Sequence, residues 1–532
     1  MKLSPSKRLI FTQFLVLIGI GVFFMSCDQG PGKLDDILKG SMNFQLNPYE
    51  KVPLGGLLTF RTDEACKVEI KIPGRIPVLK SFSKYETHHS ISVLGLYPDT
   101  INLVTVKLTT KDDDVFLGDF EIKTDPLPYF FPTIEIAILD RAQMEPGFHL
   151  IEMLIANNGK FLSYTIMFDD NGDIRWFMDM SSVGQIAYSG LRIRNGNWLY
   201  LSWIDIWELS DLGEVIQNEK MWLYAGNHHI IELEGDRILM GGSKKDAKVI
   251  RRDGYKTITR YDYMIEWDRK ANKGVKEWDL AEVLDINRSV YPEDYGLDTK
   301  IDWFHINSIT QSLKDNSLLV SGRNQGVLKV DSDNNLQWIL APHRGWGKSG
   351  RTGEGFNTSD YLLTAIDSNK VAFAEPVQQG IQAMDGFEWS TGQHALNILD
   401  NGNLLLFDNG LSRNFKETPS YSRAVEYRID EKNMTIQQVW EYGKSRGLDM
   451  YSPITSDVDV LPTTQNRLIT VGNIRESSAP PHSKIIEITY PDNKEVFEAY
   501  VFFKDAKGSG EKSWAQFDLV FRGERYPLYN DH

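Results

Sequence analysis

One structural unit recurs six times along the chain, and this recurrence constrains the fold more than any other feature. The unit is a strand, an acidic or glycine-containing turn, and a second strand that ends in an aromatic residue. The six copies run from Tyr164 to Trp176, Asp205 to Trp222, Tyr263 to Trp278, Gly326 to Trp338, Ala424 to Trp440 and Lys484 to Tyr500. A further turn and apolar strand precede five of them. Four-stranded units at intervals of about 40–60 residues are typical of a β-propeller. The pattern therefore predicts an all-β protein with a six-bladed propeller over residues 126–532.

Two segments do not follow this repeat. The first copy lacks its inner strands, and Ser513 to Arg522 at the C-terminus is the candidate that completes this blade and closes the ring. The segment from Ala341 to Trp389 is longer than the repeat allows. We interpret it as an insertion, which is often functional where it covers a pocket.

The N-terminal part of the chain has a different organisation. Lys7 and Arg8 precede the apolar run Leu9 to Phe24, which as a helix spans about 24 Å, less than the roughly 30 Å of a bilayer core. An export signal is therefore favoured over a membrane span. Ser26-Cys27 at its end resembles a bacterial lipoprotein cleavage box, so residues 1–27 are interpreted as a lipoprotein signal peptide. The alternative is simple cleavage.

These features predict an exported protein that a lipid on Cys27 anchors to a membrane. It would face the periplasm of a Gram-negative bacterium or lie on the cell surface. Residues 28–40 are interpreted as a tether. Short alternating strands such as Val104 to Leu108 then indicate a small β-sandwich domain at 41–125. Cys66 would have no disulfide partner and is expected to be a buried thiol.

Charge excludes two classes of partner. Lys and Arg number 58 against 73 Asp and Glu, which gives a net charge of −15, and no basic block interrupts the sequence. Nucleic acids and anionic membrane surfaces are bound by clustered cations, so neither is expected here.

The repeat register brings several polar side chains to one place. The blades align on the apolar residue before each turn, which is Ile193, Leu233, Leu313, Leu399 or Leu461. Five residues upstream of these positions lie Tyr188, His228, His394 and Ser456, and His305 lies eight upstream of Leu313. The innermost strands of a propeller face its central channel. The register therefore predicts that three of the ten histidines meet in one cavity.

Converging histidines suit either a metal or an anion. A metal site would be expected to include carboxylates, as ligands or as their supports. The neighbours in the sequence are instead Asn307 and Arg323, whose amide and guanidinium groups donate hydrogen bonds. We therefore predict a site for a tetrahedral oxyanion, with no metal and no cofactor.

Several longer motifs point to a known family. They are Asp302 to Ile309, Ser321-Gly322-Arg323, Gly392-Gln393-His394 and Leu399 to Gly410, together with Leu46 to Tyr49 and Val93 to Pro98 near the N-terminus. Over roughly residues 41–525 the chain resembles the bacterial arylsulfate sulfotransferases. The resemblance implies a periplasmic, often dimeric propeller that moves a sulfuryl group from an aryl sulfate to a phenol without a nucleotide sulfate donor.

The resemblance also implies residue roles. His394 matches the histidine that becomes transiently sulfurylated in a ping-pong reaction, and His305, Asn307 and Arg323 match residues that hold the sulfate. His228 or His229 supplies a further imidazole, and the blade register favours His228. We assign the acid–base role to His305. Weaker candidates for the substrate channel are Tyr97, Tyr188, Thr455 and Ser456.

The sequence is also compatible with two other functions. One is a non-catalytic lipoprotein propeller that binds an anionic aromatic ligand or a protein partner. It would show saturable binding without turnover. The other is a metal-dependent propeller lyase or hydrolase, which a chelator would inactivate.

Overall fold

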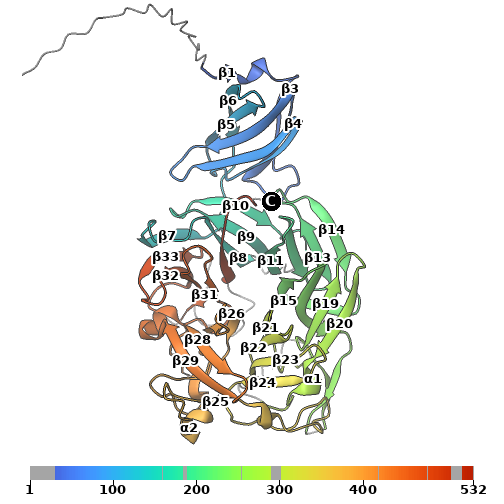
Figure 1. Ribbon diagram of the computed structural model, residues 1–532, viewed down its shortest axis with the longest axis vertical. Coiled ribbons are helices and arrows are strands. Elements are labelled where there is room, and N and C mark those ends of the chain that lie inside the picture. Colours follow the sequence, from blue (N-terminus) through green and yellow to red (C-terminus); the bar gives the residue numbers. More distant parts are fainter. Residues whose placement is uncertain are drawn as a thin grey trace, which may run out of the picture.

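The computed structural model describes residues 30–157, 160–183, 188–252, 254–288, 301–416, 418–475, 477–504 and 518–530. The proposed signal peptide and Cys27 lie outside these residues. Within them the chain is almost entirely β-structure, with an N-terminal sheet and a larger group of sheets below it (Figure 1). Among the described residues, no helix has the length and apolar character that a membrane crossing requires.

The N-terminal domain is one connected six-stranded sheet. Its strands are β1 (Gly32–Lys33), β2 (Asn43–Leu46), β3 (Gly55–Ile72), β4 (Val78–Leu94), β5 (Ile101–Thr110) and β6 (Val115–Lys123), and a short 3-10 helix, η1, covers Leu34–Asp36. The order is β1-β6-β5-β3-β2, and β4 pairs with the other side of β3. The β3–β4 ladder is irregular between Arg61 and Cys66, so β2 pairs with one half of β3 and β5 with the other. Cys66 is a fully buried free thiol, as predicted.

The rest of the described chain forms six sheets of four or five strands and one small hairpin. With the innermost strand named first, the first two sheets are β34 (Leu519–Tyr526), β8 (Phe148–Asn157), β9 (Lys160–Phe168) and β10 (Ile174–Asp179), and β11 (Tyr188–Arg192), β12 (Trp198–Ser202), β13 (Asp205–Leu209) and β14 (Val215–Lys220). The third and fourth sheets are β15 (Tyr224–Glu232), β16 (Arg237–Lys244), β19 (Tyr263–Asp268) and β20 (Lys273–Asp279), and β21 (Ile306–Gln311), β22 (Leu318–Gly322), β23 (Gly326–Val330) and β24 (Leu336–Leu340). The fifth and sixth sheets have five strands each: β26 (His394–Ile398), β27 (Leu404–Asp408), β28 (Arg423–Asp430), β29 (Thr435–Tyr442) and β25 (Thr364–Ala365), and β30 (Asp457–Val460), β31 (Arg467–Ile474), β32 (His482–Ile488), β33 (Glu495–Phe502) and β7 (Thr133–Leu139). The hairpin is β17 (Lys248–Ile250) with β18 (Lys256–Ile258).

The first strands of these sheets contact one another in chain order. β11 contacts β15, β15 contacts β21, β21 contacts β26, β26 contacts β30, and β30 contacts β34, whose neighbour β8 contacts β11. Figure 1 shows the sheets surrounding a common centre. β34 pairs with β8, so the C-terminal segment completes the first sheet as predicted, although the strand begins at Leu519. The innermost strands therefore form a closed circuit.

Each predicted hairpin forms the outer part of a sheet, and its aromatic end packs in the core in most copies. Trp176 and Trp338 are at most 2% exposed. Trp222 differs because β14 ends at Lys220, which leaves this side chain 74% exposed in the connecting loop.

The insertion from Ala341 to Trp389 lies at the outside of its sheet. It contains the 3-10 helix η2 (Thr358–Tyr361), the strand β25 and the helix α2 (Glu375–Gln378). β25 pairs in parallel with β29, at the edge farthest from β26. The insertion therefore extends the periphery of the sheet. Elsewhere the short helices are α1 (Leu280–Val283), η3 (Arg413–Phe415) and η4 (Lys444–Met450).

Candidate functional site

The innermost strands enclose a cavity of about 210 Å³. Its wall contains five of the side chains that the sequence singled out. They are His229, Asn307, His394, Thr455 and Ser456. They come from β15, β21, β26 and the entry to β30, so residues more than 200 positions apart meet at one site.

Local irregularities in the strands shape this wall. In four innermost strands, β11, β15, β21 and β26, the ladder with the neighbouring strand shifts register. The shifts lie between Tyr188 and Leu191, between Gly226 and Ile230, between Ile306 and Ser308, and between His394 and Asn397. A bulge interrupts the alternation of side chains and re-aims them, which is why bulges are frequent at active sites. These shifts occur beside the histidines and Asn307. On these four strands the direction of a site side chain thus depends on a bulge as well as on the period of the strand.

A longer turn changes the predicted register in one sheet. Leu313 is 94% exposed, and the backbone N–H that closes this turn belongs to Ser312, which donates to the carbonyl of Ser317 at 2.9 Å. The turn is one residue longer than predicted. The position five residues upstream is therefore Asn307, and His305 precedes the strand with a left-handed φ of 60°.

His394 is held in one tautomer. Its Nδ1 lies 2.7 Å from Asn409 Oδ1 and 3.0 Å from the carbonyl oxygen of Gly392. Both partners accept hydrogen bonds, so Nδ1 carries the proton and Nε2 keeps a free electron pair. Burial lowers the pKa of His394 to about 3, and the nearby charges of Arg323 and His305 act in the same direction. The ring is therefore neutral near pH 7.

His229 has the opposite tautomer. The backbone N–H of Ile309 donates to its Nδ1 at 3.1 Å, which leaves the proton of a neutral ring on Nε2. Burial lowers the pKa of His229 to about 3, helped by the positive charge of Arg522 and by His394. The cavity thus contains one imidazole with a free electron pair and another with a free N–H.

Asn307 lines the cavity together with His394, whereas His305 and Arg323 are not among its lining residues but lie close enough to His394 to lower its pKa. The Asp302 carboxylate hydrogen-bonds to His305 Nδ1, and the backbone N–H of Arg323 donates to the His305 carbonyl at 3.0 Å. Asn307 Nδ2 donates to the carbonyl of Gln393 at 2.7 Å. This bond joins β21 directly to the residue before His394.

The remaining predicted residues have different placements. Thr455 and Ser456 line the cavity, and both have positive φ angles. The side chains of His228 and Tyr188 lie outside the described residues, so His229 is the member of the histidine pair that the described cavity contains. Tyr97 is not brought to the cavity. Its ring lies under the Arg175 guanidinium, 3.5 Å from ring centroid to Cζ, at the junction with the N-terminal domain.

A group of acidic residues that the sequence did not predict lies in the same cavity. Asp457, Asp459 and Glu524 offer carboxylate oxygens within 4.8 Å of one another, and Arg522 with Glu152 lies beside them. Burial and mutual repulsion raise the pKa of Asp457 and of Asp459 well above the usual value. The signal that could have found them is the alternation Asp457-Val458-Asp459, which places two acidic side chains on one face of an innermost strand.

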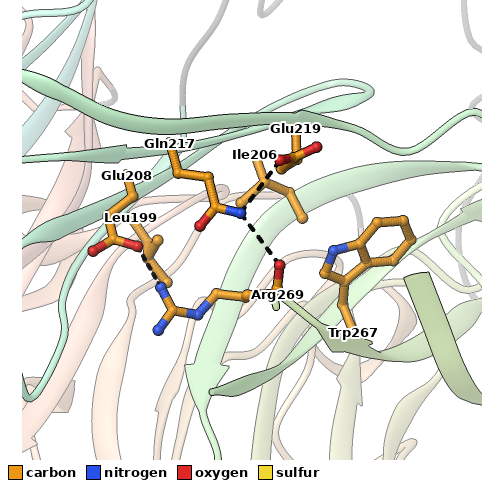
Figure 2. A pocket seen from close by; sticks show the side chains of 7 residues that line it. All are labelled: Leu199, Ile206, Glu208, Gln217, Glu219, Trp267 and Arg269. Atoms are coloured by element: carbon orange, nitrogen blue, oxygen red, sulfur yellow. Dashed lines mark hydrogen bonds and ion pairs between the residues drawn. The ribbon is translucent and has the colours of Figure 1, made fainter. Parts of the chain in front are cut away.

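A second, much smaller hollow lies between two neighbouring sheets (Figure 2). Its volume of about 10 Å³ has room for roughly one water molecule. An ion pair spans it, with Arg269 Nη1 and Glu208 Oε2 2.6 Å apart. The hollow contains none of the residues predicted for the site, and its polar groups join two sheets.

The fold and the central cavity define an all-β protein with two neutral imidazoles, hydrogen-bond donors and a group of carboxyl side chains in one cavity. Comparison with known proteins identifies the class. The arylsulfotransferase (ASST) family model matches residues 137–508, and the model of the arylsulfotransferase Ig-like domain matches residues 44–125. The chain therefore belongs to the arylsulfotransferase family and is an aryl sulfotransferase.

Individual relatives agree over most of the chain. The arylsulfate sulfotransferase AssT of Escherichia coli O6:H1 (strain CFT073) is 26% identical over 545 residues, which are 85% of this chain and 88% of that protein. The enzyme of the same name from Lelliottia amnigena is 26% identical over 557 residues, 87% and 89% of the two chains. Among solved structures, the extracellular domain of a hybrid two-component system from B. thetaiotaomicron covers 90% of this chain and 51% of its own, at 10% identity and a TM-score of 0.34.

Proposed function

We propose that this enzyme transfers a sulfuryl group from an aryl sulfate to a phenol in two steps, through a covalent sulfohistidine on His394. One observation carries the proposal. Asn409 and the Gly392 carbonyl both accept from Nδ1 of a neutral His394, so the unprotonated Nε2 is available as a nucleophile.

In the first step the electron pair of His394 Nε2 attacks the sulfur atom of the donor. The bond between sulfur and the aryl oxygen breaks, and its electrons pass to the leaving phenolate. His305 donates a proton to that oxygen, and the Asp302 carboxylate holds its ring through Nδ1. The product is a sulfurylated His394 and a free phenol.

In the second step an acceptor phenol replaces the first product. His305 takes its proton, and the phenol oxygen attacks sulfur. The sulfur–nitrogen bond then breaks, and its electrons return to Nε2. The enzyme recovers its starting protonation state, as a ping-pong reaction requires.

Donors around His394 would stabilise the charge on the sulfuryl oxygens. Arg323 and the Nε2–H of His229 are the candidates, together with Asn307, although the Asn307 amide also donates to Gln393. Each donor to such an oxyanion contributes about 3 kcal/mol. We assign sulfate binding to these side chains and substrate contacts to Thr455 and Ser456. His228 and Tyr188, whose side chains lie outside the described residues, stay predictions from the sequence, and Tyr97 lies under Arg175 away from the cavity.

We also propose that the ring is a six-bladed propeller and that the enzyme is exported and anchored by a lipid. The closed circuit of innermost strands supports a six-bladed propeller. The apolar run before Cys27 supports export and lipid anchoring, which would place the enzyme in the periplasm or on the cell surface. Labelling cells with a radioactive fatty acid tests the anchor, since Cys27→Ala should abolish incorporation.

The chemistry can be tested with a chromogenic aryl sulfate and a second phenol. Release of the chromophore should require the acceptor. His394→Ala should lower the transfer rate by about 10⁴-fold or more, because no other group replaces the nucleophile. Without acceptor, mass spectrometry of the wild-type enzyme should find one sulfuryl group on the peptide that contains His394.

The matched control is His88→Ala, which removes an exposed histidine of the N-terminal domain and should leave transfer unchanged. Equal release with water alone would identify a sulfatase. Transfer without a sulfurylated His394 would reject the covalent mechanism.

A further inference from the structure

Asn409 is a fully buried amide that contacts His394 from the strand beside it. It follows the last residue of β27, which pairs with β26. Its Nδ2 donates to two backbone carbonyls, that of Ser452 at 2.7 Å and that of Thr455 at 2.9 Å. Carbonyl oxygens only accept, so the amide has one satisfactory orientation. That orientation directs Oδ1 at His394 Nδ1.

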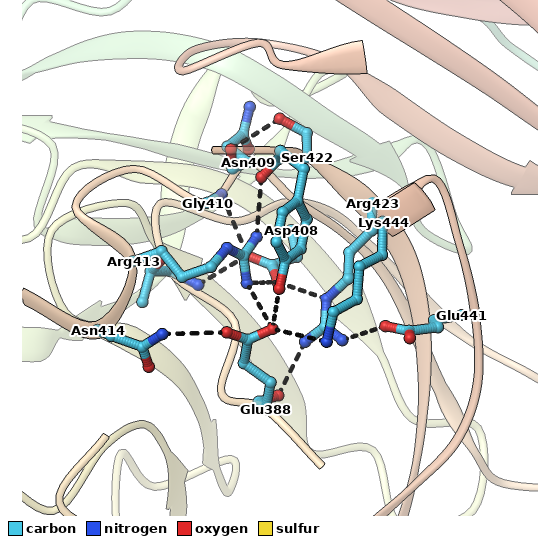
Figure 3. Close-up of polar contacts among 12 residues, drawn as sticks. Glu388, Asp408, Asn409, Gly410, Arg413, Asn414, Ser422, Arg423, Glu441 and Lys444 are labelled. Carbon is cyan, nitrogen blue, oxygen red and sulfur yellow. Dashed lines mark hydrogen bonds and ion pairs between the residues drawn. The ribbon is translucent and has the colours of Figure 1, made fainter. Parts of the chain in front are cut away.

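A network of buried charges supports this arrangement (Figure 3). The Asp408 carboxylate accepts from the guanidinium groups of Arg413 and Arg423, each at 2.8 Å, and from the backbone N–H groups of Thr391 and Gly410. These bonds tie the end of β27 to the segment before His394. Because the backbone on both sides of the contact is held, the distance between Asn409 and His394 is defined by the fold.

A second set of bonds holds the backbone of Asn409. Ser422 Oγ donates to the Asn409 carbonyl at 2.7 Å and accepts from the backbone N–H of Ser452 at 2.9 Å. In the described part of the chain, no hydrogen bond joins Ser422 to His394. It therefore provides a matched position where the same loop can be weakened without changing the partner of the imidazole.

We propose that Asn409 is the positioning residue of the sulfuryl transfer: its amide oxygen keeps the His394 proton on Nδ1, so that Nε2 presents its electron pair, and it does so without the negative charge by which a carboxylate would favour protonation of the ring. The inference rests on the proposed sulfohistidine mechanism. In the sulfurylated intermediate Nδ1 still carries its proton, and Asn409 Oδ1 still accepts a hydrogen bond from it.

The contrast with His305 supports this assignment. His305 Nδ1 is hydrogen-bonded to a carboxylate, that of Asp302, whereas His394 Nδ1 is hydrogen-bonded to an amide. A carboxylate stabilises the protonated imidazole that an acid–base catalyst must form more strongly than a neutral amide does. The Asn409 hydrogen bond raises the pKa of His394, but burial outweighs it. Two adjacent imidazoles thus receive different roles from their partners.

Other ionisable groups act on His394 from neighbouring strands. Arg323 and His305 disfavour its protonation, and His229 is near enough to interact with it. Asp457 and Asp459 of β30 and Glu524 of β34 face the same cavity. Asn409 is nevertheless the side chain that hydrogen-bonds to the ring, so its replacement changes the contact directly.

The experiment compares Asn409→Ala, Asn409→Asp and Ser422→Ala with the wild type. Each is assayed for transfer across pH and for sulfurylation of His394 by mass spectrometry. Asn409→Ala should lower kcat at least about tenfold at every pH; the Gly392 carbonyl still accepts from Nδ1, which limits the loss. Asn409→Asp keeps an acceptor but adds a negative charge, so its activity should fall at low pH, should rise above that of Asn409→Ala at high pH, and should begin at a higher pH than in the wild type.

Ser422→Ala should keep the wild-type pH profile even where its thermal stability falls. Equal loss in Asn409→Ala and Asn409→Asp with an unchanged pH profile would overturn the proposal and leave Asn409 a purely structural role. Wild-type kinetics in Asn409→Ala would also overturn it. A wild-type enzyme that transfers sulfuryl groups without sulfurylating His394 would instead reject the mechanism on which the inference rests.

Discussion

At the scale of single residues, the chemistry depends on which atoms the imidazoles present. His394 and His229 are both neutral, but hydrogen bonds from their surroundings place the proton on different nitrogens. The motif Gly392-Gln393-His394 indicates a reactive histidine. It does not indicate that Asn409, fifteen residues later, determines the tautomer, because this contact forms only when β26 and β27 pair.

The Asp302–His305 contact yields a prediction at this scale. Asp302→Asn removes the charge that stabilises protonated His305, so transfer at neutral pH should fall by about 10²-fold. The loss should be larger for donors whose leaving phenol is weakly acidic, because these depend most on proton donation. Steady-state rates with a series of substituted aryl sulfates measure this.

Asp333→Asn is the control, since Asp333 is exposed in a turn remote from the cavity residues. A uniform loss across the series of leaving groups would argue against proton transfer by His305.

At the scale of elements, the innermost strands combine bulges with inward-facing polar residues. β30 carries Asp457 and Asp459 on one face, and β34 brings Glu524 beside them. Like charges so close, and largely removed from water, destabilise the folded state when they ionise. The strand tolerates them because Arg522, on β34, lies in the same cavity.

A stability prediction follows from these carboxyl groups. The pKa of Asp459 is raised in the folded state by burial and by the charges of Asp457 and Glu524. A raised pKa means that the folded protein binds the proton more tightly than the unfolded chain, so stability is lost as pH rises through the folded value. Asp459→Asn should therefore raise the unfolding temperature more in alkaline buffer than near the unfolded pKa of about 4.

Thermal unfolding followed by circular dichroism at both pH values gives the measurement. Asp457→Asn should change stability in the same direction. An equal shift of the unfolding temperature at acidic and alkaline pH would show that Asp459 is not the titrating group.

At the scale of the whole molecule, a buried arginine joins the N-terminal sheet to the first sheet of the ring. Arg175 is fully buried. Its guanidinium donates to the carbonyls of Gly95, at 2.6 and 3.1 Å, and of Ile76, at 2.8 Å, and it pairs with Asp169 at 3.0 Å. Groups from both domains therefore satisfy the buried positive charge of Arg175.

Arg175→Ala should lower the free energy of unfolding by about 3–5 kcal/mol, because it leaves Asp169 buried without its counter-ion. Arg75→Ala is the matched control at the same junction. Its ion pair with Asp173 is largely exposed, so its loss should cost about 1 kcal/mol or less. Chemical denaturation measures both, and equal effects would contradict a buried anchor.

The sequence by itself determined the repeated hairpins, the closing C-terminal strand and five of the side chains that line the cavity. These depend on local periodicity and on turn residues such as Asp400-Asn401-Gly402, which a single chain displays directly. Only the tertiary structure showed that His229 lines the described cavity, that the insertion extends an outer edge, and that Asn409 and the carboxylates of β30 and β34 belong to the site. The physical reason is that bulges break the alternation of the innermost strands, and that contacts between strands far apart in the chain place each proton and each charge.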